Sequence, residues 1–346
     1  MSTSELCNII KEKIALHGEF YIADSADEGV HHLLGSTPMK VGDSIEIIYD
    51  RTRDLEGSFT EGGLSPTFVL SHDKKFLGVM SDVDIFENGK KQAYYYSSDL
   101  RVDPKCKGKT RLKFRNCYKD IVADMPGKMF TCILDENKRA INALTKGKHF
   151  FYHKRFPYTA CTTLMTPFMR RLSSYDFEFK VISKEEAKAY FIEHNKSVEF
   201  IAFHDSQNYF GVYKNNKLVG VVSADRSKYK KLLAHPLDFF SKACLFISKK
   251  VFKQSYEKEM PWVYLTNFLV SDEESAAKII ESFIKFLYIQ KELKSGELFQ
   301  FILGQSESLP TSIFPMIKTN GTLYEVSASE ENGHFYEKSF LNPLML

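Results

Sequence analysis

The chain has 346 residues, of which 43% are hydrophobic and 26% are charged, and its formal net charge is +3. At about 100 to 200 residues per domain, this length predicts two domains or one large one. The composition excludes a wholly disordered or fibrous protein. The small net charge argues against a surface given over to nucleic-acid binding.

Two further features concern location and metal binding. The sequence has no apolar stretch near the roughly 18 residues that a membrane-spanning helix needs, and its polar start lacks the order of a signal peptide. We therefore expect a cytoplasmic protein with no membrane partner. The six cysteines are scattered without a Cys-x-x-Cys pair. We expect reduced thiols, no disulfide framework and no metal site.

The first part of the chain is rich in strand patterns, and an amphipathic helix is expected to open it. The polar, glycine-bearing stretch 50–63 is predicted to be a surface loop. Turn residues at 72–75 and 87–90 predict three consecutive antiparallel strands. The expected elements are a helix at 2–16, a short helix at 25–35, and strands at 20–24, 44–49, 67–70, 76–86 and 92–102.

Helices and strands then alternate, and the same plan is repeated. We expect helices at 107–121 and 138–145, strands at 129–134, 150–152 and 158–164, and a linker at 170–174. From about residue 175 we expect strands at 177–182, 209–213, 218–223, 262–270 and 299–303, and helices at 184–193 and 273–293. Because the order recurs, the sequence predicts two copies of one fold.

One segment carries most of the chemical information. Between 101 and 115 the chain has seven cationic residues against the single acid Asp103. A strand ends there at a proline-containing turn, and a loop with Gly108 opens a helix. Backbone N–H groups and the helix dipole at such a terminus favour an anion, so the segment is suited to a polyphosphate. The alternative is a solvated charge run on a helix face.

The residues of this segment resemble a known family. The run LRVDPKCKGKTRL, at 100–112, resembles the acyl-CoA signature of the GNAT acetyltransferase superfamily, and 135–140 resembles its later Asn-x-x-Ala element. The resemblance implies an α+β protein of two tandem GNAT-like domains, each a mixed, mostly antiparallel sheet flanked by helices. The implied domains are 1–170, which binds acyl-CoA, and 171–346, a degenerate copy whose acidic stretch 270–275 repels phosphate.

The resemblance also implies roles for individual residues. Main-chain amides of the loop would bind the CoA diphosphate, the end of the preceding strand would hydrogen-bond pantetheine and the thioester carbonyl, and Asn137 would lie near the pantetheine arm. The diphosphate residues are Lys107, Gly108, Lys109, Thr110, Arg111 and Leu112, and the pantetheine residues are Leu100, Arg101 and Val102. The sequence departs from the family at Lys107, Thr110 and Leu112, where the family has Gln or Arg, Gly, and a small residue.

Candidates for proton transfer are fewer. Asp99, on the strand that leads into the loop, is either a general base for an amine or a carboxylate held by a turn. Tyr152 is the substitute for the family's tyrosine acid, because Leu144 stands at the usual position. Asp82 and Asp84, near Glu87, could bind a cationic amine or lie on the solvent-exposed face of a sheet.

The function implied is transfer of an acetyl or other acyl group from acetyl-CoA, or another acyl-CoA, to an amine of a small molecule or peptide. Two alternatives stay open: a non-catalytic tandem GNAT-like binding or scaffold protein, and an aminoacyl-tRNA-dependent transferase. The net charge of +3 disfavours the nucleic-acid partner that the last one needs. The sequence does not identify the acceptor, the acyl chain or the oligomeric state.

Overall fold

The computed structural model describes residues 4–35, 39–41, 45–50, 54–106, 108–145, 151–172, 175–195, 198–200, 202–205, 207–229, 231–253, 255–256, 258–271, 274–313, 316–327 and 339–341. The elements up to residue 171 are α1 (Glu5–His17), β1 (Phe20–Ala23), α2 (Glu28–Gly35), β2 (Met39–Val41), β3 (Ile45–Asp50), α3 (Leu55–Thr60), β4 (Leu64–Ser71), β5 (Phe76–Glu87), β6 (Lys90–Val102), α4 (Gly108–Asp124), β7 (Met129–Leu134), α5 (Lys138–Thr145), β8 (Phe151–Leu164) and the 3-10 helix η1 (Pro167–Arg171). The later elements are β9 (Glu178–Ile182), α6 (Lys184–His194), β10 (Val198–Phe200), β11 (Tyr209–Lys214), β12 (Lys217–Asp225), β13 (Lys231–Pro236), α7 (Phe239–Phe252), β14 (Trp262–Val270), α8 (Ala276–Ile289), β15 (Leu298–Gly304), β16 (Met316–Ser327) and β17 (Ser339–Leu341).

Local sequence rules explain many of these boundaries. Ser4 caps α1 by accepting a hydrogen bond from the Cys7 backbone N–H, and Gly18 ends it in the left-handed conformation at φ 63°. The β5–β6 turn places Asn88 and Gly89 at φ 51° and 73°, and residues that tolerate positive φ are what a tight hairpin turn requires. The sequence patterns therefore located these elements correctly.

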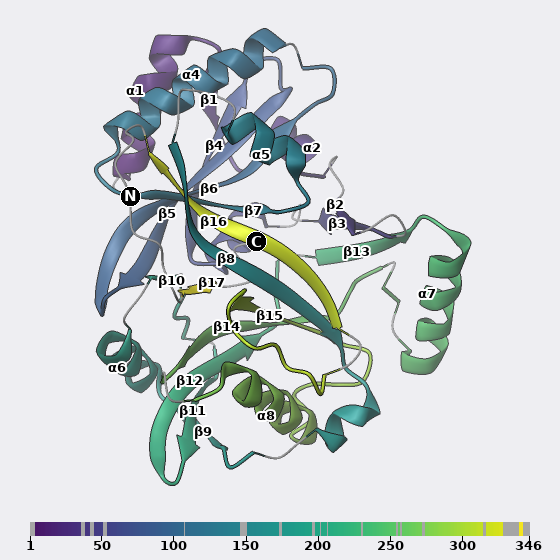
Figure 1. Ribbon diagram of the computed structural model, residues 1–346. Coiled ribbons are helices and arrows are strands. Elements are labelled where there is room, and N and C mark those ends of the chain that lie inside the picture. The colour runs from purple at the N-terminus through teal and green to yellow at the C-terminus, as the bar shows by residue number, and fades with distance from the viewer. Residues whose placement is uncertain are drawn as a thin grey trace.

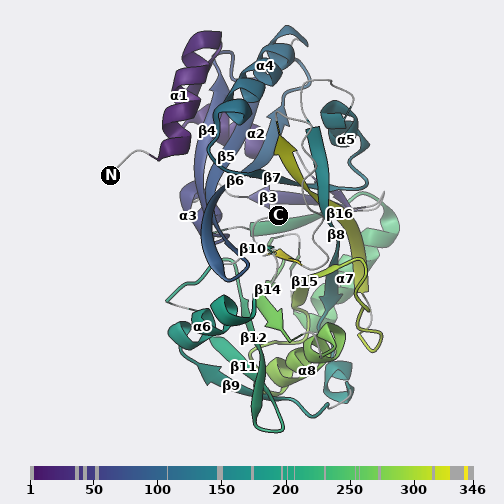
Figure 2. The same ribbon diagram turned by 60° about the vertical axis from the view of Figure 1, so that its left-hand side comes forward.

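One sheet of 14 strands runs through the molecule. Its main path is β1-β4-β5-β6-β7-β16-β8-β15-β14-β12-β11-β9. The long strands β8 and β16 pair with each other and run through the middle of the molecule in both ribbon views (Figures 1 and 2). On one side of them lies the part built mainly from β1 to α5, and on the other the part built from β9 to β15.

The two parts exchange strands. β16, near the end of the chain, pairs with β7 through Gly321–Val326, and so completes the sheet of the first part. β8, from the first part, pairs through residues 158–164 with β15 of the second. The predicted division at residue 170 stays a prediction, but each part depends on a strand from the other side of that boundary.

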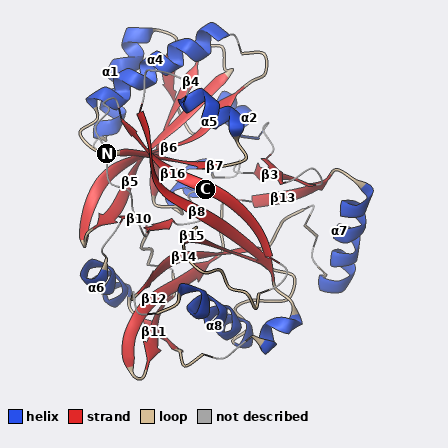
Figure 3. Cartoon of the chain, viewed as in Figure 1, coloured by secondary structure: helices blue, strands red, loops and turns tan. Residues whose placement is uncertain are grey.

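Helices cover the sheet in layers, which are easiest to follow by secondary-structure colour (Figure 3). The first part has two apolar cores, one against α1 and α4 and one against α2 and α3. The second part has its own core, to which α6 and α8 contribute. Among the described helices, none is long and apolar enough to cross a membrane.

Some predicted elements were wrong. The stretch expected to be a loop contains α3, which Asp54 caps by accepting from the Gly57 N–H at 2.8 Å and which buries Leu55 and Phe59. The strands expected at 150–152 and 158–164 are one strand, β8, in which Pro157 pairs in register with Thr322 and Arg155 is an extra residue in a bulge against β16.

The patterns also missed a second, three-stranded sheet. It has the order β13-β3-β2 and joins strands from both parts of the chain. Helix α7 follows β13 and stands at the edge of the molecule beside this sheet (Figure 1).

Candidate functional site

The candidate site begins where β6 and β7 separate. Their parallel pairing consists of Tyr95 with Met129 and Tyr96 with Phe130. Within these two strands, all of whose backbone is described, no pairing between them continues past Tyr96. The rest of β6 therefore has an edge along which an extended ligand can form backbone hydrogen bonds.

A bulge changes the direction of β6 at the same place. Ser98 pairs with Val79 and Arg101 with Leu77, so β6 has one residue more than β5 between these pairs. Asp99 lies in the bulge with φ 46°, a value that Asp tolerates better than most residues. A bulge re-aims the backbone N–H groups that follow it, here those of the predicted pantetheine residues Leu100 to Val102.

The basic loop follows directly. Asp103 holds the turn, since its carboxylate accepts from the Lys105 N–H at 2.6 Å and its carbonyl accepts from the Cys106 N–H at 2.9 Å. Helix α4 begins at Gly108, where an added Cβ would meet no atom within 4 Å. The terminus of this helix is thus open on the side of Gly108. Lys107 lies outside the described residues.

The other loop residues divide into two groups. Lys109, Arg111 and Leu112 are exposed, whereas Thr110 is buried in the first turn of α4. The side chain of Thr110, which stands where the family has glycine, therefore packs toward the protein. The exposed cations leave a positive potential around the helix terminus, which adds to the effect of the helix dipole.

Gly78 fixes how closely α4 approaches the bulge. An added Cβ at Gly78 would come within 2.6 Å of the Phe114 ring. Phe114 also packs on Phe76, with ring centroids 4.2 Å apart, and on Phe20 at 5.5 Å. The missing side chain on β5 thus lets α4 lie directly over the strand that faces the bulge.

The predicted proton-transfer residues have different surroundings. The Asp99 carboxylate accepts a hydrogen bond from Arg101 at 2.7 Å, and its side chain is 7% exposed. Asn137 caps α5 by accepting from the Ala140 N–H at 3.1 Å. The backbone of Tyr152 lies opposite Val326 in β8, but its side chain lies outside the described residues. The structure brings Asp99 and Arg101 together, and their roles stay predictions.

Two buried tyrosines, Tyr96 and Tyr158, and the partly buried Cys132 lie beside the separation of β6 and β7. The thiol of Cys132, on β7, accepts a hydrogen bond from the hydroxyl of Tyr96 on β6, and Tyr158 on β8 lies beside both. Burial raises the pKa of Cys132 to about 12 and raises that of Tyr96 well above its usual value. Both groups are therefore protonated at neutral pH.

A glycine makes this cluster of Tyr96, Cys132 and Tyr158 possible. Tyr158 pairs with Gly321 on β16, and a Cβ at Gly321 would lie 2.5 Å from both the Tyr158 Cζ and its hydroxyl oxygen. The ring thus crosses the bare backbone of β16 toward β7. Alternation along β6 places Tyr94 and Tyr96 on one face, but no local pattern reveals that Tyr158 lies opposite Gly321.

Two serine hydroxyls near the bulge lack a partner. Ser81, on β5, pairs in register with Tyr96, and Ser98 precedes Asp99 on β6. Both Oγ atoms are buried, and neither has a hydrogen-bond partner among the described residues. A buried hydroxyl without a partner is costly, so these atoms indicate where a ligand or water would bind.

The second part also has two parallel strands that separate beside a bulge, but different side chains lie there. Strands β14 and β15 pair only through Trp262–Tyr264 and Leu298–Gln300, and β14 has one extra residue opposite Ser223 and Ala224. Here, however, the Asn267 amide donates to Ser223 at 2.9 Å and to Gln207 at 3.1 Å, and all three side chains are buried. Protein groups thus accept from the Asn267 amide nitrogen, whereas its Oδ1 has no hydrogen-bond partner among the described residues.

The start of α8 also differs from the start of α4. Glu274 accepts from Lys214 at 2.8 Å and 3.0 Å, while Asp272 and Glu273 lie outside the described residues. Near the start of α8, Lys214 is the described cation that forms an ion pair, and the charge of Lys214 is matched by Glu274. Among the described residues, this terminus has fewer cations than the start of α4, namely Lys278 and the Glu274-paired Lys214.

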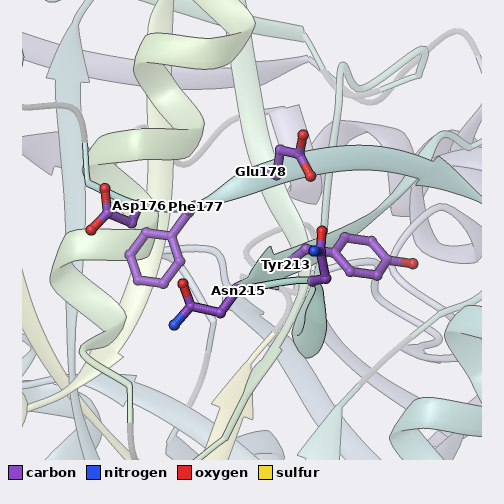
Figure 4. Close-up of a pocket in the computed structure, with 6 residues that line it drawn as sticks. Asp176, Phe177, Glu178, Tyr213 and Asn215 are labelled. Carbon is purple, nitrogen blue, oxygen red and sulfur yellow. The ribbon is translucent and has the colours of Figure 1, made fainter.

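A surface pocket of about 350 Å³ lies elsewhere, at the start of β9 and the β11–β12 turn (Figure 4). Its acids include Glu178, which already pairs with Lys180 at 2.7 Å, and its aromatic residues are Phe177 and Tyr213. None of its residues belongs to β6 or α4, so we do not place the reaction there. In the described residues, no group of His, Cys, Asp and Glu side chains could hold a metal ion.

Comparison with solved structures identifies the fold. A tandem GNAT protein from the clavulanic acid biosynthesis pathway matches with a TM-score of 0.53 at 8% identity, over 91% of this chain and 99% of that one. Saccharomyces cerevisiae N-myristoyltransferase with bound myristoyl-CoA matches with a TM-score of 0.50 at 10% identity, over 90% and 79%. The chain has a tandem GNAT-like α+β fold, as predicted.

These likenesses concern the fold. No protein-family model matches the sequence, and no curated protein matches it. The structural neighbours are GNAT acyltransferases, and the activity of this chain has to be argued from its own residues.

Proposed function

We propose that the first part of the molecule binds acetyl-CoA or another acyl-CoA and transfers the acyl group to an amine. The proposal rests on three features that follow one another along the chain. They are the separation of β6 from β7, the bulge at Asp99, and the basic start of α4 at Gly108. An extended chain ending in a diphosphate would meet backbone donors first and positive charge at its end.

In this proposal the loop from Lys107 to Leu112 binds the diphosphate through main-chain amides, with Lys109 and Arg111 adding charge. Leu100, Arg101 and Val102 hydrogen-bond pantetheine, and a main-chain donor near the bulge stabilises the oxyanion that forms when the amine attacks the thioester. Asn137 caps α5 and lies near the pantetheine arm. Most of the rate acceleration comes from positioning, so no side-chain triad is required.

Proton transfer needs two groups. The thiolate that leaves must gain a proton, and Tyr96 is a second candidate donor beside Tyr152, because its raised pKa keeps the hydroxyl protonated at neutral pH. The base proposed for the amine is Asp99. Its Oδ1 accepts a hydrogen bond from Arg101, and in this proposal an oxygen of the same carboxylate accepts the proton of the amine.

The binding step can be tested by calorimetry with acetyl-CoA. We expect the double variant Lys109→Glu/Arg111→Glu to lose at least about tenfold in affinity, since it reverses two charges at a phosphate site. The matched control is Lys119→Glu/Lys188→Glu, which changes the net charge equally at exposed positions further along α4 and on α6. Absence of binding to the native protein, or an equal loss in the control, would contradict the assignment.

The catalytic step can be tested separately. Asn tolerates positive φ as Asp does, so Asp99→Asn keeps the bulge while removing the basic carboxylate. If Asp99 is the base, we expect kcat to fall by about 100-fold or more with unchanged acetyl-CoA affinity. A decrease of less than about threefold would assign Asp99 a structural role. Acetyl-CoA binding without turnover on any amine in a panel of small amines and peptides would favour the non-catalytic alternative.

A further inference from the structure

Helix α7 is unusual in that it contributes almost nothing to a core. Among its described side chains none is buried, although the helix is 14 residues long and largely apolar. Figures 1 and 3 show it at the edge of the molecule, next to β13 and away from the main sheet. A surface helix normally buries one apolar stripe, and α7 leaves its own stripe in water.

The exposed apolar side chains are large. Phe239 is 86% exposed, Phe246 61%, Ile247 58% and Val251 65%. The side chains of Leu245, Ser248 and Phe252 are only partly exposed. With 3.6 residues per turn, these three lie on one side of the helix, and the four exposed apolar residues lie on the opposite side. The unpartnered surface is therefore one continuous face.

The same face is strongly basic. Lys242, Lys249, Lys250 and Lys253 are exposed, and the sequence has no acidic residue between 239 and 253. Helical spacing places Lys242 and Lys249 along one border of the apolar face, with Lys250 between Phe239 and Ile247, and Lys253 follows the end of the helix with φ 57°. The ammonium group of Lys250 lies 5.6 Å from the centroid of the Phe246 ring. Aromatic and aliphatic side chains thus alternate with cations.

We propose that α7 is a docking helix for the surface of an anionic lipid bilayer. Its aliphatic and aromatic side chains would enter the boundary between headgroups and acyl chains, and the lysines would contact acidic headgroups. Charge decides between this occupant and a second copy of the chain. Two copies of an acid-free face with four lysines would repel each other, whereas an anionic surface complements them.

This mode of binding differs from the one that sequence analysis addressed. The expectation of no membrane partner rested on the absence of a spanning segment, and a helix that lies in the interface needs no such length. The proposal is independent of the acyl-transfer proposal, because α7 shares no residue with β6, β7 or α4.

The test uses the full chain and vesicle co-sedimentation. We expect binding to phosphatidylcholine vesicles with about 30% phosphatidylserine, no binding to pure phosphatidylcholine, and weaker binding as salt is raised from about 0.1 M to about 0.5 M. Ile247→Glu/Val251→Glu should abolish binding. Lys249→Glu/Lys250→Glu should weaken it by at least about 25-fold, at about fivefold for each basic residue at an anionic surface.

Two matched controls complete the design. Val181→Glu/Ile317→Glu makes the same chemical change at apolar residues that are 70% and 57% exposed elsewhere, and Lys119→Glu/Lys188→Glu matches the charge change. Both controls should bind like the native protein. Thermal unfolding curves check that every variant is folded.

Three outcomes would overturn the proposal. These are equal binding to neutral and anionic vesicles, native binding by the α7 variants, and absence of vesicle binding by the native protein. If sedimentation equilibrium instead finds a dimer that Ile247→Glu/Val251→Glu dissociates, the face belongs to a second copy. If the helix binds an acidic protein but no vesicle, the lipid assignment is likewise refuted.

Discussion

Replacing Gly321 by alanine tests how the Tyr96, Cys132 and Tyr158 cluster is held. Gly321 lies in β16 and does not have a positive φ. On conformational grounds alone, alanine would therefore stabilise the protein by about 0.4 to 1 kcal/mol, because it restricts the unfolded chain. The nearby ring of Tyr158 reverses the sign of this expected change in stability.

The magnitude follows from the contact. An added Cβ would lie 2.5 Å from Tyr158 Cζ and from its hydroxyl oxygen, and Tyr158 is 0% exposed. The ring cannot move into solvent, so it must displace packed neighbours, at about 1 to 3 kcal/mol. After subtracting the conformational gain, we expect Gly321→Ala to destabilise the protein by about 0.5 to 2.5 kcal/mol.

Urea unfolding of five proteins, the four of a double-mutant cycle and one control, separates this cause from others. A double-mutant cycle combines Gly321→Ala with Tyr158→Leu, whose shorter side chain leaves room for the methyl group. In the Tyr158→Leu background, Gly321→Ala should cost less than about 0.5 kcal/mol. Gly35→Ala is the control, since an added Cβ there meets nothing within 4 Å. An equal cost of Gly321→Ala in both backgrounds would refute the proposed contact.

Two further predictions concern the exchanged strands and the buried acids. The fragment 1–170, expressed alone, lacks both described partners of β8 and the longer partner of β7, so we expect no cooperative thermal unfolding by circular dichroism; a sharp transition would show that the half folds independently. Burial raises the pKa of Cys117 and Cys132 to about 12 and that of Cys161 to about 11. Between about pH 8.5 and pH 12 the folded state therefore binds more protons than the unfolded state. The free energy of unfolding should consequently fall as pH rises through this range. The same shift should make alkylation of Cys132 at pH 8 about a thousandfold slower than that of an ordinary thiol; a pH-independent unfolding free energy or rapid alkylation would contradict the burial.

Sequence analysis correctly located the elements that local sequence rules determine without help from tertiary contacts. Gly18 and Asn88-Gly89 require positive φ, and alternation along β5 and β6 follows from burial on one face. The expected loop at 50–63 was wrong because Leu55 and Phe59 give only a single turn of apolar spacing, too short a pattern to outweigh the glycines around it. The two strands expected at 150–152 and 158–164 form one strand, β8, in which Arg155 is an extra residue opposite β16.

The candidate site was predictable in part. The basic loop at the start of α4 follows from charge and turn residues, and the structure places that loop next to the bulge. The bulge itself, and the cluster of Tyr96, Cys132 and Tyr158, depend on register between strands far apart in the sequence. No local pattern specifies that register, because it is set when β16 enters the sheet.

The position of β16 has a consequence for synthesis of the protein on the ribosome. Its pairing partners in β7 were made about 190 residues earlier, as Gly321 with Leu134 shows, so this part of the sheet stays open until β16 has left the exit tunnel. At about 5 to 20 residues per second, the edges of β7 and β8 are exposed for roughly 10 to 40 seconds of translation. During that interval the nascent chain presents unpaired strand edges to its surroundings, which makes it a natural client for chaperones that shield such edges.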